Sequence, residues 1–89
     1  MSGVPECTRQ IFSYLDQLYS LNEEQERLQH RISDLRSLQR DILDLGFPDH
    51  PYLSTLREEE YWAGASLSAN ALETSYVQDN LRANGMCLP

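Results

Sequence analysis

A heptad repeat runs through residues 11–42, which read IFSYLDQLYSLNEEQERLQHRISDLRSLQRDI. Eight of the ten first and fourth heptad positions in this stretch hold apolar or aromatic side chains, and the other two hold glutamine. A repeat of this kind predicts a long α-helix that buries one narrow seam against a second helix. The predicted seam consists of Ile11, Tyr14, Leu18, Leu21, Leu28, Ile32, Leu35 and Ile42.

The two glutamines of the repeat are Gln25 and Gln39. They either hydrogen-bond to each other or to other buried polar groups, which would set the register of the helices, or they face the rim of the helix pair. The sequence leaves both alternatives open.

Proline and glycine bound the heptad repeat on both sides. Pro5 suits the first turn of a helix, where no hydrogen-bond donor is needed. Gly46 accepts the left-handed conformation that ends a helix, and Pro48 prevents the helix from continuing. We therefore expect a first helix over about residues 5–45 and a linker over about residues 46–50.

A second helix is expected over about residues 51–84, followed by a short tail at 85–89. Asp49 can cap this helix, although the capping-box pattern of residues 55–58 allows a later start. Gly64 lies inside the predicted helix, and we expect the helix to continue through it without a kink.

The second helix carries two apolar sectors. One contains Trp62, Ala65, Ala69, Leu72, Tyr76 and Ala83, and the other contains Leu56, Ala63, Leu67, Val77 and Leu81. The sectors lie roughly 140° apart at 100° per residue. Two apolar sectors on one helix require two neighbours, whereas a hairpin supplies one. The second neighbour must therefore come from another chain.

These features predict a single all-α domain in which two long helices form an antiparallel hairpin with coiled-coil-like packing. A short connection between long helices favours the antiparallel arrangement. A parallel pairing of two first helices would place Arg31 opposite Arg36, and the two charges would repel. Because a lone hairpin buries only a small core, we expect two copies to dimerise into a four-helix bundle.

Cys7 and Cys87 lie near opposite ends of the chain, and an antiparallel hairpin brings these ends together. A disulfide between them is geometrically possible, but we expect two reduced thiols in a cytosolic protein. Neither cysteine has metal-ligand spacing to His30 or His50. The sequence therefore predicts no metal site and no cofactor.

Four aromatic residues gather around the predicted tip of the hairpin: Phe47, Tyr52, Tyr61 and Trp62. We expect Trp62 to pack in the core. Phe47 is expected to be an exposed anchor for a partner, or alternatively to hold the linker onto the helices.

Acidic residues outnumber basic ones by 14 to 7, every basic residue is an arginine, and the formal net charge is −7. The most acidic run, residues 58–60, is expected to lie in the first turn of the second helix and to complement its dipole, the alternative being contact with a basic partner. An acidic chain argues against direct nucleic-acid binding. No apolar run is long enough to span a membrane and no signal peptide is visible, so we expect the protein in the cytoplasm, the nucleus or the cytosol of a host cell.

The sequence contains neither a Gly-rich phosphate loop nor a cysteine–histidine pair placed for catalysis. We therefore do not expect an enzyme. The leading hypothesis is a non-catalytic protein–protein interaction module, a small acidic adaptor or subunit that forms a homodimer or docks into a larger helical assembly. The alternative is a small acidic inhibitor or nucleic-acid mimic, encoded for example by a phage or pathogen, that blocks a basic groove of its target. The alternatives differ in how steeply salt weakens partner binding.

Overall fold

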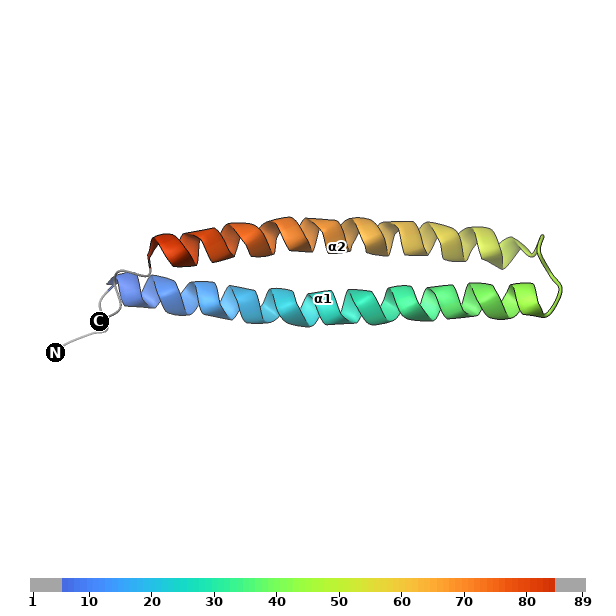
Figure 1. Ribbon diagram of the computed structural model, residues 1–89, viewed down its shortest axis with the longest axis horizontal. Coiled ribbons are helices and arrows are strands. Elements are labelled where there is room, and N and C mark those ends of the chain that lie inside the picture. Colours follow the sequence, from blue (N-terminus) through green and yellow to red (C-terminus); the bar gives the residue numbers. More distant parts are fainter. Residues whose placement is uncertain (1–5, 85–89) are drawn as a thin grey trace.

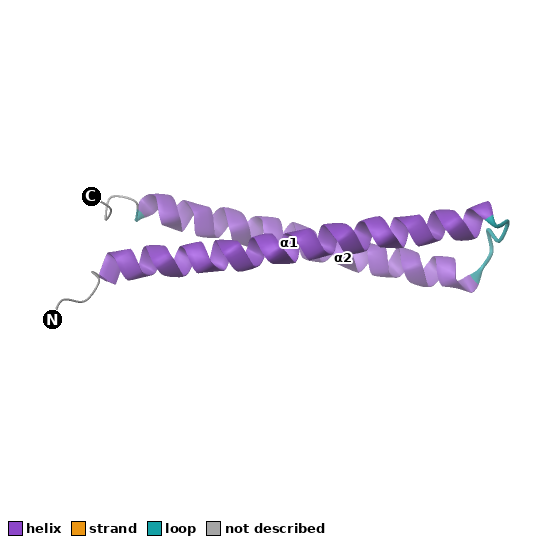
Figure 2. Ribbon diagram, turned by 90° about the horizontal axis from the view of Figure 1, so that it is seen from below, coloured by secondary structure: helices purple, strands orange, loops and turns teal. Residues whose placement is uncertain are grey.

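The computed structural model describes residues 6–84, which form two helices joined by a short turn (Figure 1). α1 spans Glu6–Asp44 and α2 spans Pro51–Ala83. The helices run antiparallel, pack against each other, and cross at a shallow angle (Figure 2). No strand occurs within the described range 6–84, so the predicted all-helical hairpin is confirmed. With a rise of 1.5 Å per residue, the 39 residues of α1 extend about 58 Å.

The end of α1 is closed by a Schellman motif. Gly46 has a positive φ of 89°, which glycine adopts without a steric penalty. Its N–H donates to the carbonyl of Leu43 at 3.0 Å, and the N–H of Phe47 donates to the carbonyl of Ile42 at 3.2 Å. These bonds satisfy two carbonyl groups that the helix end would otherwise leave without a donor.

The start of α2 differs from the expected one. His50, and not Asp49, occupies the N-cap, because its extended backbone brings Nδ1 within 3.1 Å of the N–H of Tyr52. Pro51 is the first helical residue, where its missing N–H costs nothing. The later start suggested by residues 55–58 is therefore wrong.

The core is a single seam between the helices, which we call the inner seam. On α1, all eight apolar residues of the heptad seam are buried or half-buried, and so are Gln25 and Gln39. On α2 and its C-cap, the buried and half-buried positions that repeat with heptad spacing are Leu53, Leu56, Glu60, Ala63, Leu67, Asn70, Thr74, Val77, Leu81 and Asn84. One of the two apolar sectors of α2 therefore faces α1, together with several polar residues.

α2 continues through Gly64 without interruption. A Cβ atom built on Gly64 meets nothing within 4 Å, so no neighbouring group in the described chain requires glycine at this position.

Cys7 is half-buried near the start of α1. Cys87 and the predicted tail at 85–89 lie outside the described residues, and so does the possible disulfide between Cys7 and Cys87.

Candidate interaction surfaces

The second apolar sector of α2 lies on the side of the helix away from α1. Five of its members repeat with a regular spacing of three and four residues, and we call them the outer stripe: Trp62, Ala65, Ala69, Leu72 and Tyr76. All five are exposed, and the three large side chains are 61%, 75% and 69% exposed, respectively. The outer stripe is thus a second heptad seam on the same helix, and no other segment of residues 6–84 covers it.

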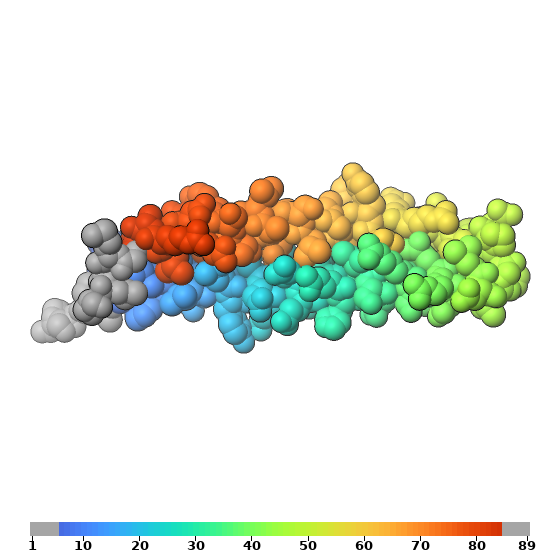
Figure 3. All heavy atoms as spheres, viewed as in Figure 1, coloured from blue at the N-terminus to red at the C-terminus, as the bar shows by residue number. Residues whose placement is uncertain are grey.

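Figure 3 shows α2 along one long edge of the molecule, with no other segment beyond it in this view. Side chains project from the outer edge of α2, away from α1, along the length of the helix. Three large and two small apolar side chains aligned on one exposed helix face are a mark of an interaction surface, whereas single exposed apolar residues are ordinary. The exposure of the outer stripe therefore indicates an interaction surface, which the exposure of a single apolar residue would not.

The aromatic residues near the tip lie on the surface. Trp62 is 61% exposed, so the expectation that it packs in the core is wrong for this hairpin. Its ring lies edge-to-face with the ring of Tyr61, and the two ring centroids are 5.3 Å apart. The indole is exposed because heptad spacing directs position 62 away from α1. Phe47 is 55% exposed, and its ring lies edge-to-face with the ring of His50, with 6.3 Å between the ring centroids.

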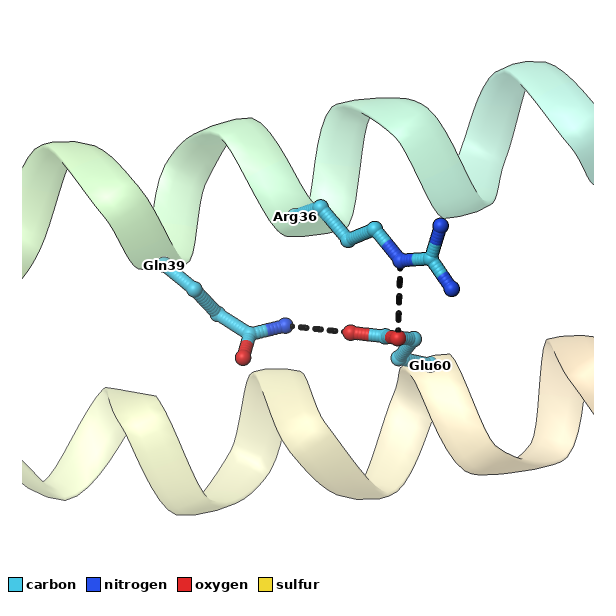
Figure 4. Close-up of polar contacts among 3 residues, drawn as sticks. All are labelled: Arg36, Gln39 and Glu60. Atoms are coloured by element: carbon cyan, nitrogen blue, oxygen red, sulfur yellow. Dashed lines mark hydrogen bonds and ion pairs between the residues drawn. The ribbon is translucent and has the colours of Figure 1, made fainter.

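A polar cluster of Arg36, Gln39 and Glu60 bridges the helices close to the inner seam (Figure 4). The Glu60 carboxylate accepts a hydrogen bond from Gln39 Nε2 at 2.8 Å and one from Arg36 Nε at 3.0 Å. These two bonds favour the ionised form and hold the pKa of Glu60 below its ordinary value of 4.5. Gln39 therefore serves as a hydrogen-bonded seam residue, the first of the two alternatives.

The acidic run at residues 58–60 does not lie in the first turn of α2, because the helix begins at Pro51. The run is in the third turn, too far from the helix start to complement its dipole. Glu59 instead pairs with Arg31 at 3.3 Å, and Glu60 joins the polar cluster. Two of the three carboxylates thus bind arginines of α1.

The two long sides of the hairpin carry opposite charge. The heptad register places four arginines on one side, which we call the basic side: Arg36, Arg40, Arg57 and Arg82. Within residues 6–84, Glu26 is the one exposed acidic residue on this side. A shallow groove on this side is lined by Arg36, Arg57, Tyr61 and Gly64. The other side, the acidic side, holds Arg27 and Arg31 with Glu6, Glu24, Asp34, Asp41, Glu59 and Glu73.

A further apolar cluster lies near the start of α1 on the basic side. Phe12, Leu15 and Tyr19 are 52%, 47% and 69% exposed. The heptad analysis missed them because they stand beside the seam and not in it. Their spacing of three and four residues is the signal that would have found them.

Neither helix in the described chain is long and apolar enough to cross a membrane. Within residues 6–84, no group of three or more His, Cys, Asp or Glu side chains is placed to hold a metal ion. No protein-family model matches the chain, and no curated protein and no solved structure matches it.

Proposed function

We propose that this chain is a non-catalytic protein–protein interaction module, which self-associates or docks into a larger helical assembly. The observation that carries the proposal is the outer stripe, a second heptad seam on the face of α2 opposite α1. A helix that packs against one neighbour needs one apolar seam. The additional seam is explained if a further helix packs against it.

The composition of the outer stripe supports this role. Tryptophan and tyrosine are enriched among residues that contribute most to binding at protein interfaces. Ala65 and Ala69 lie between the large side chains, and small residues let a second helix approach closely. The stripe therefore combines anchoring side chains with room for a partner.

Site-specific photo-crosslinking in the source cell tests the proposal. A photoreactive amino acid replaces Leu72 in the outer stripe, and in the matched control it replaces Glu23, an exposed residue of α1. We expect a crosslinked species from position 72 and none from position 23. A crosslink to a second copy identifies self-association, and a crosslink to another protein identifies docking. If position 72 gives no more crosslinking than position 23, the proposed function is wrong.

The acidic side supports a second candidate function, a small inhibitor that occupies a basic groove. Its acids run along one side of the hairpin, but Arg27 and Arg31 stand among them and Glu59 is already paired with Arg31. Binding through this side would weaken steeply as salt is raised from 50 mM to 500 mM, whereas binding through the outer stripe would change little. A salt titration of any complex identified by crosslinking separates the two functions.

A further inference from the structure

We propose that a second copy of this chain covers the outer stripe, with the two α2 helices antiparallel and Ala69 of each copy facing Leu72 of the other. This inference rests on the proposed function and specifies its partner. It is argued from the sizes and charges of residues that the hairpin leaves exposed on α2.

The sizes of the stripe residues select this register. In an antiparallel coiled coil, each a position of one helix faces a d position of the other, so neighbouring registers differ by one heptad. In the outer stripe, Trp62, Ala69 and Tyr76 are the a positions, and Ala65 and Leu72 are the d positions. With Ala69 facing Leu72, Ala65 faces Tyr76, and each of these layers combines one large and one small side chain. Helices pack evenly when large and small residues alternate across facing positions.

The neighbouring registers pack less evenly. One heptad away in one direction, Trp62 faces Leu72 and Ala65 faces Ala69, so two layers are crowded and two are nearly empty. One heptad away in the other direction, Leu72 faces Tyr76 in two crowded layers. Asp79 also moves from the end of the seam to its interior, where its carboxylate faces Ala69. A parallel pairing places each residue against itself and again separates large layers from small ones.

The charges beside the stripe select the same register. With Ala69 facing Leu72, none of the closest flanking pairs joins two like charges: Ser66 with Glu73, Glu59 with Asn80, Ser68 with Ser75, and Tyr61 with Arg82. The last pair allows a cation–π contact. The register that brings Ala65 against Ala69 instead places Glu59 near Glu73 twice, and these carboxylates repel each other. Asp79, which faces Trp62 at the end of the proposed seam, already lies 3.6 Å from Arg82 of its own helix.

The basic side does not suit a second copy. Two copies meeting there would bring arginines from both chains together, with Glu26 as the one exposed acid that each contributes from residues 6–84. The five residues of the outer stripe are uncharged. In the proposed dimer the four helices lie side by side in one layer, with both α2 helices in the middle, because the stripe is opposite the inner seam.

The solution mass gives the first test. Size exclusion with light scattering should give twice the 10.3 kDa mass of one chain. Tyr76→Glu should raise the dimer dissociation constant by at least roughly tenfold, because it places a charge in an apolar seam. The matched control is Tyr19→Glu, since Tyr19 is also a helical tyrosine and both are 69% exposed. Circular dichroism checks that both variants remain helical.

The register is tested by the distance between spin labels. A label is attached to Thr55→Cys in chains that carry Cys7→Ser and Cys87→Ser, and light scattering confirms that these chains still dimerise. At 1.5 Å per residue, the proposed register separates the two labels by about 46 Å along the helices, the neighbouring registers by about 36 Å or about 57 Å, and a parallel pairing by only the interhelical spacing.

Three results would overturn the inference: a monomeric wild-type chain, a dimer that Tyr19→Glu disrupts and Tyr76→Glu does not, or a label distance that belongs to another register. The proposed function is judged separately by the crosslink from position 72. A monomer that crosslinks from this position to a different protein keeps the function and rejects the second copy.

Discussion

The side-chain amide of Asn70 donates a hydrogen bond to the main-chain carbonyl oxygen of Leu21, across the two helices, at 2.9 Å. Asn70 is only 2% exposed, and Thr74 donates to its Oδ1 from the next turn of α2 at 3.4 Å. Both ends of the amide therefore have a partner inside the inner seam. Because the bond joins one position of α2 to one position of α1, it helps to set the register of the hairpin.

Asn70→Asp is expected to lower the free energy of unfolding by about 2–4 kcal/mol, because a buried carboxylate would face the Leu21 carbonyl oxygen without a donor between them. Urea unfolding at pH 7, followed by circular dichroism, measures the change. Asn80→Asp is the control, since the Asn80 amide donates only to the carbonyl of Tyr76 in its own helix. Equal losses in the two variants would show that the bond to Leu21 contributes nothing specific.

Glu60 predicts a pH dependence of stability. Hydrogen bonds from Gln39 and Arg36 hold the pKa of folded Glu60 below its ordinary value of 4.5. The stabilising contribution is therefore complete above pH 4.5 and is lost as the pH falls through the lower pKa of the folded state. We expect the urea midpoint to fall on acidification, and to fall less in Glu60→Gln.

The control for this pH effect is Glu58→Gln, which removes an exposed carboxylate two residues away. This variant should keep the wild-type pH dependence. If Glu58→Gln and Glu60→Gln change the acid limb of the stability curve equally, the effect comes from net charge and not from the polar cluster.

Leu35 and Leu38 differ in burial although they are three residues apart on α1. Leu35 is 5% exposed and lies in the inner seam, whereas Leu38 is 49% exposed. Leu35→Ala is expected to cost about 2–4 kcal/mol of unfolding free energy, since it leaves a cavity in the core. Leu38→Ala should change this free energy by less than about 0.5 kcal/mol. Similar losses of unfolding free energy at both sites would contradict the assignment of Leu35, and not Leu38, to the inner seam.

The two glycines of the described chain predict opposite responses to alanine. Gly64→Ala should raise the free energy of unfolding by about 1 kcal/mol, because it removes glycine from a helix interior where a Cβ meets nothing within 4 Å. Gly46→Ala should lower it by about 1–2 kcal/mol, because alanine is strained at a positive φ. Thermal unfolding of the two variants measures both signs, and a destabilised Gly64→Ala would indicate close packing against this position.

The heptad seam of α1 was visible in the sequence because its signal is local. Apolar residues recur at fixed spacing from Ile11 to Ile42, and a helix converts this spacing into one face. The seam of α2 was only partly visible, since Glu60, Asn70 and Thr74 occupy seam positions. A search for apolar periodicity passes over polar residues, and their hydrogen bonds exist only once α1 is beside them.

The pattern of apolar residues, glycine and proline is enough to predict that α2 has two apolar faces, that the chain turns at Gly46, and that two helices pack as a hairpin. Which of the two faces of α2 meets α1 depends on how the helices pack against each other. The apolar part of the inner seam on α2 extends from Leu53 to Leu81 and is nearly as long as the heptad seam of α1, whereas the outer stripe runs only from Trp62 to Tyr76. Packing through the longer seam buries more apolar surface and gives Glu60 and Asn70 their hydrogen-bond partners. Trp62, Leu72 and Tyr76 are left facing outward for that reason.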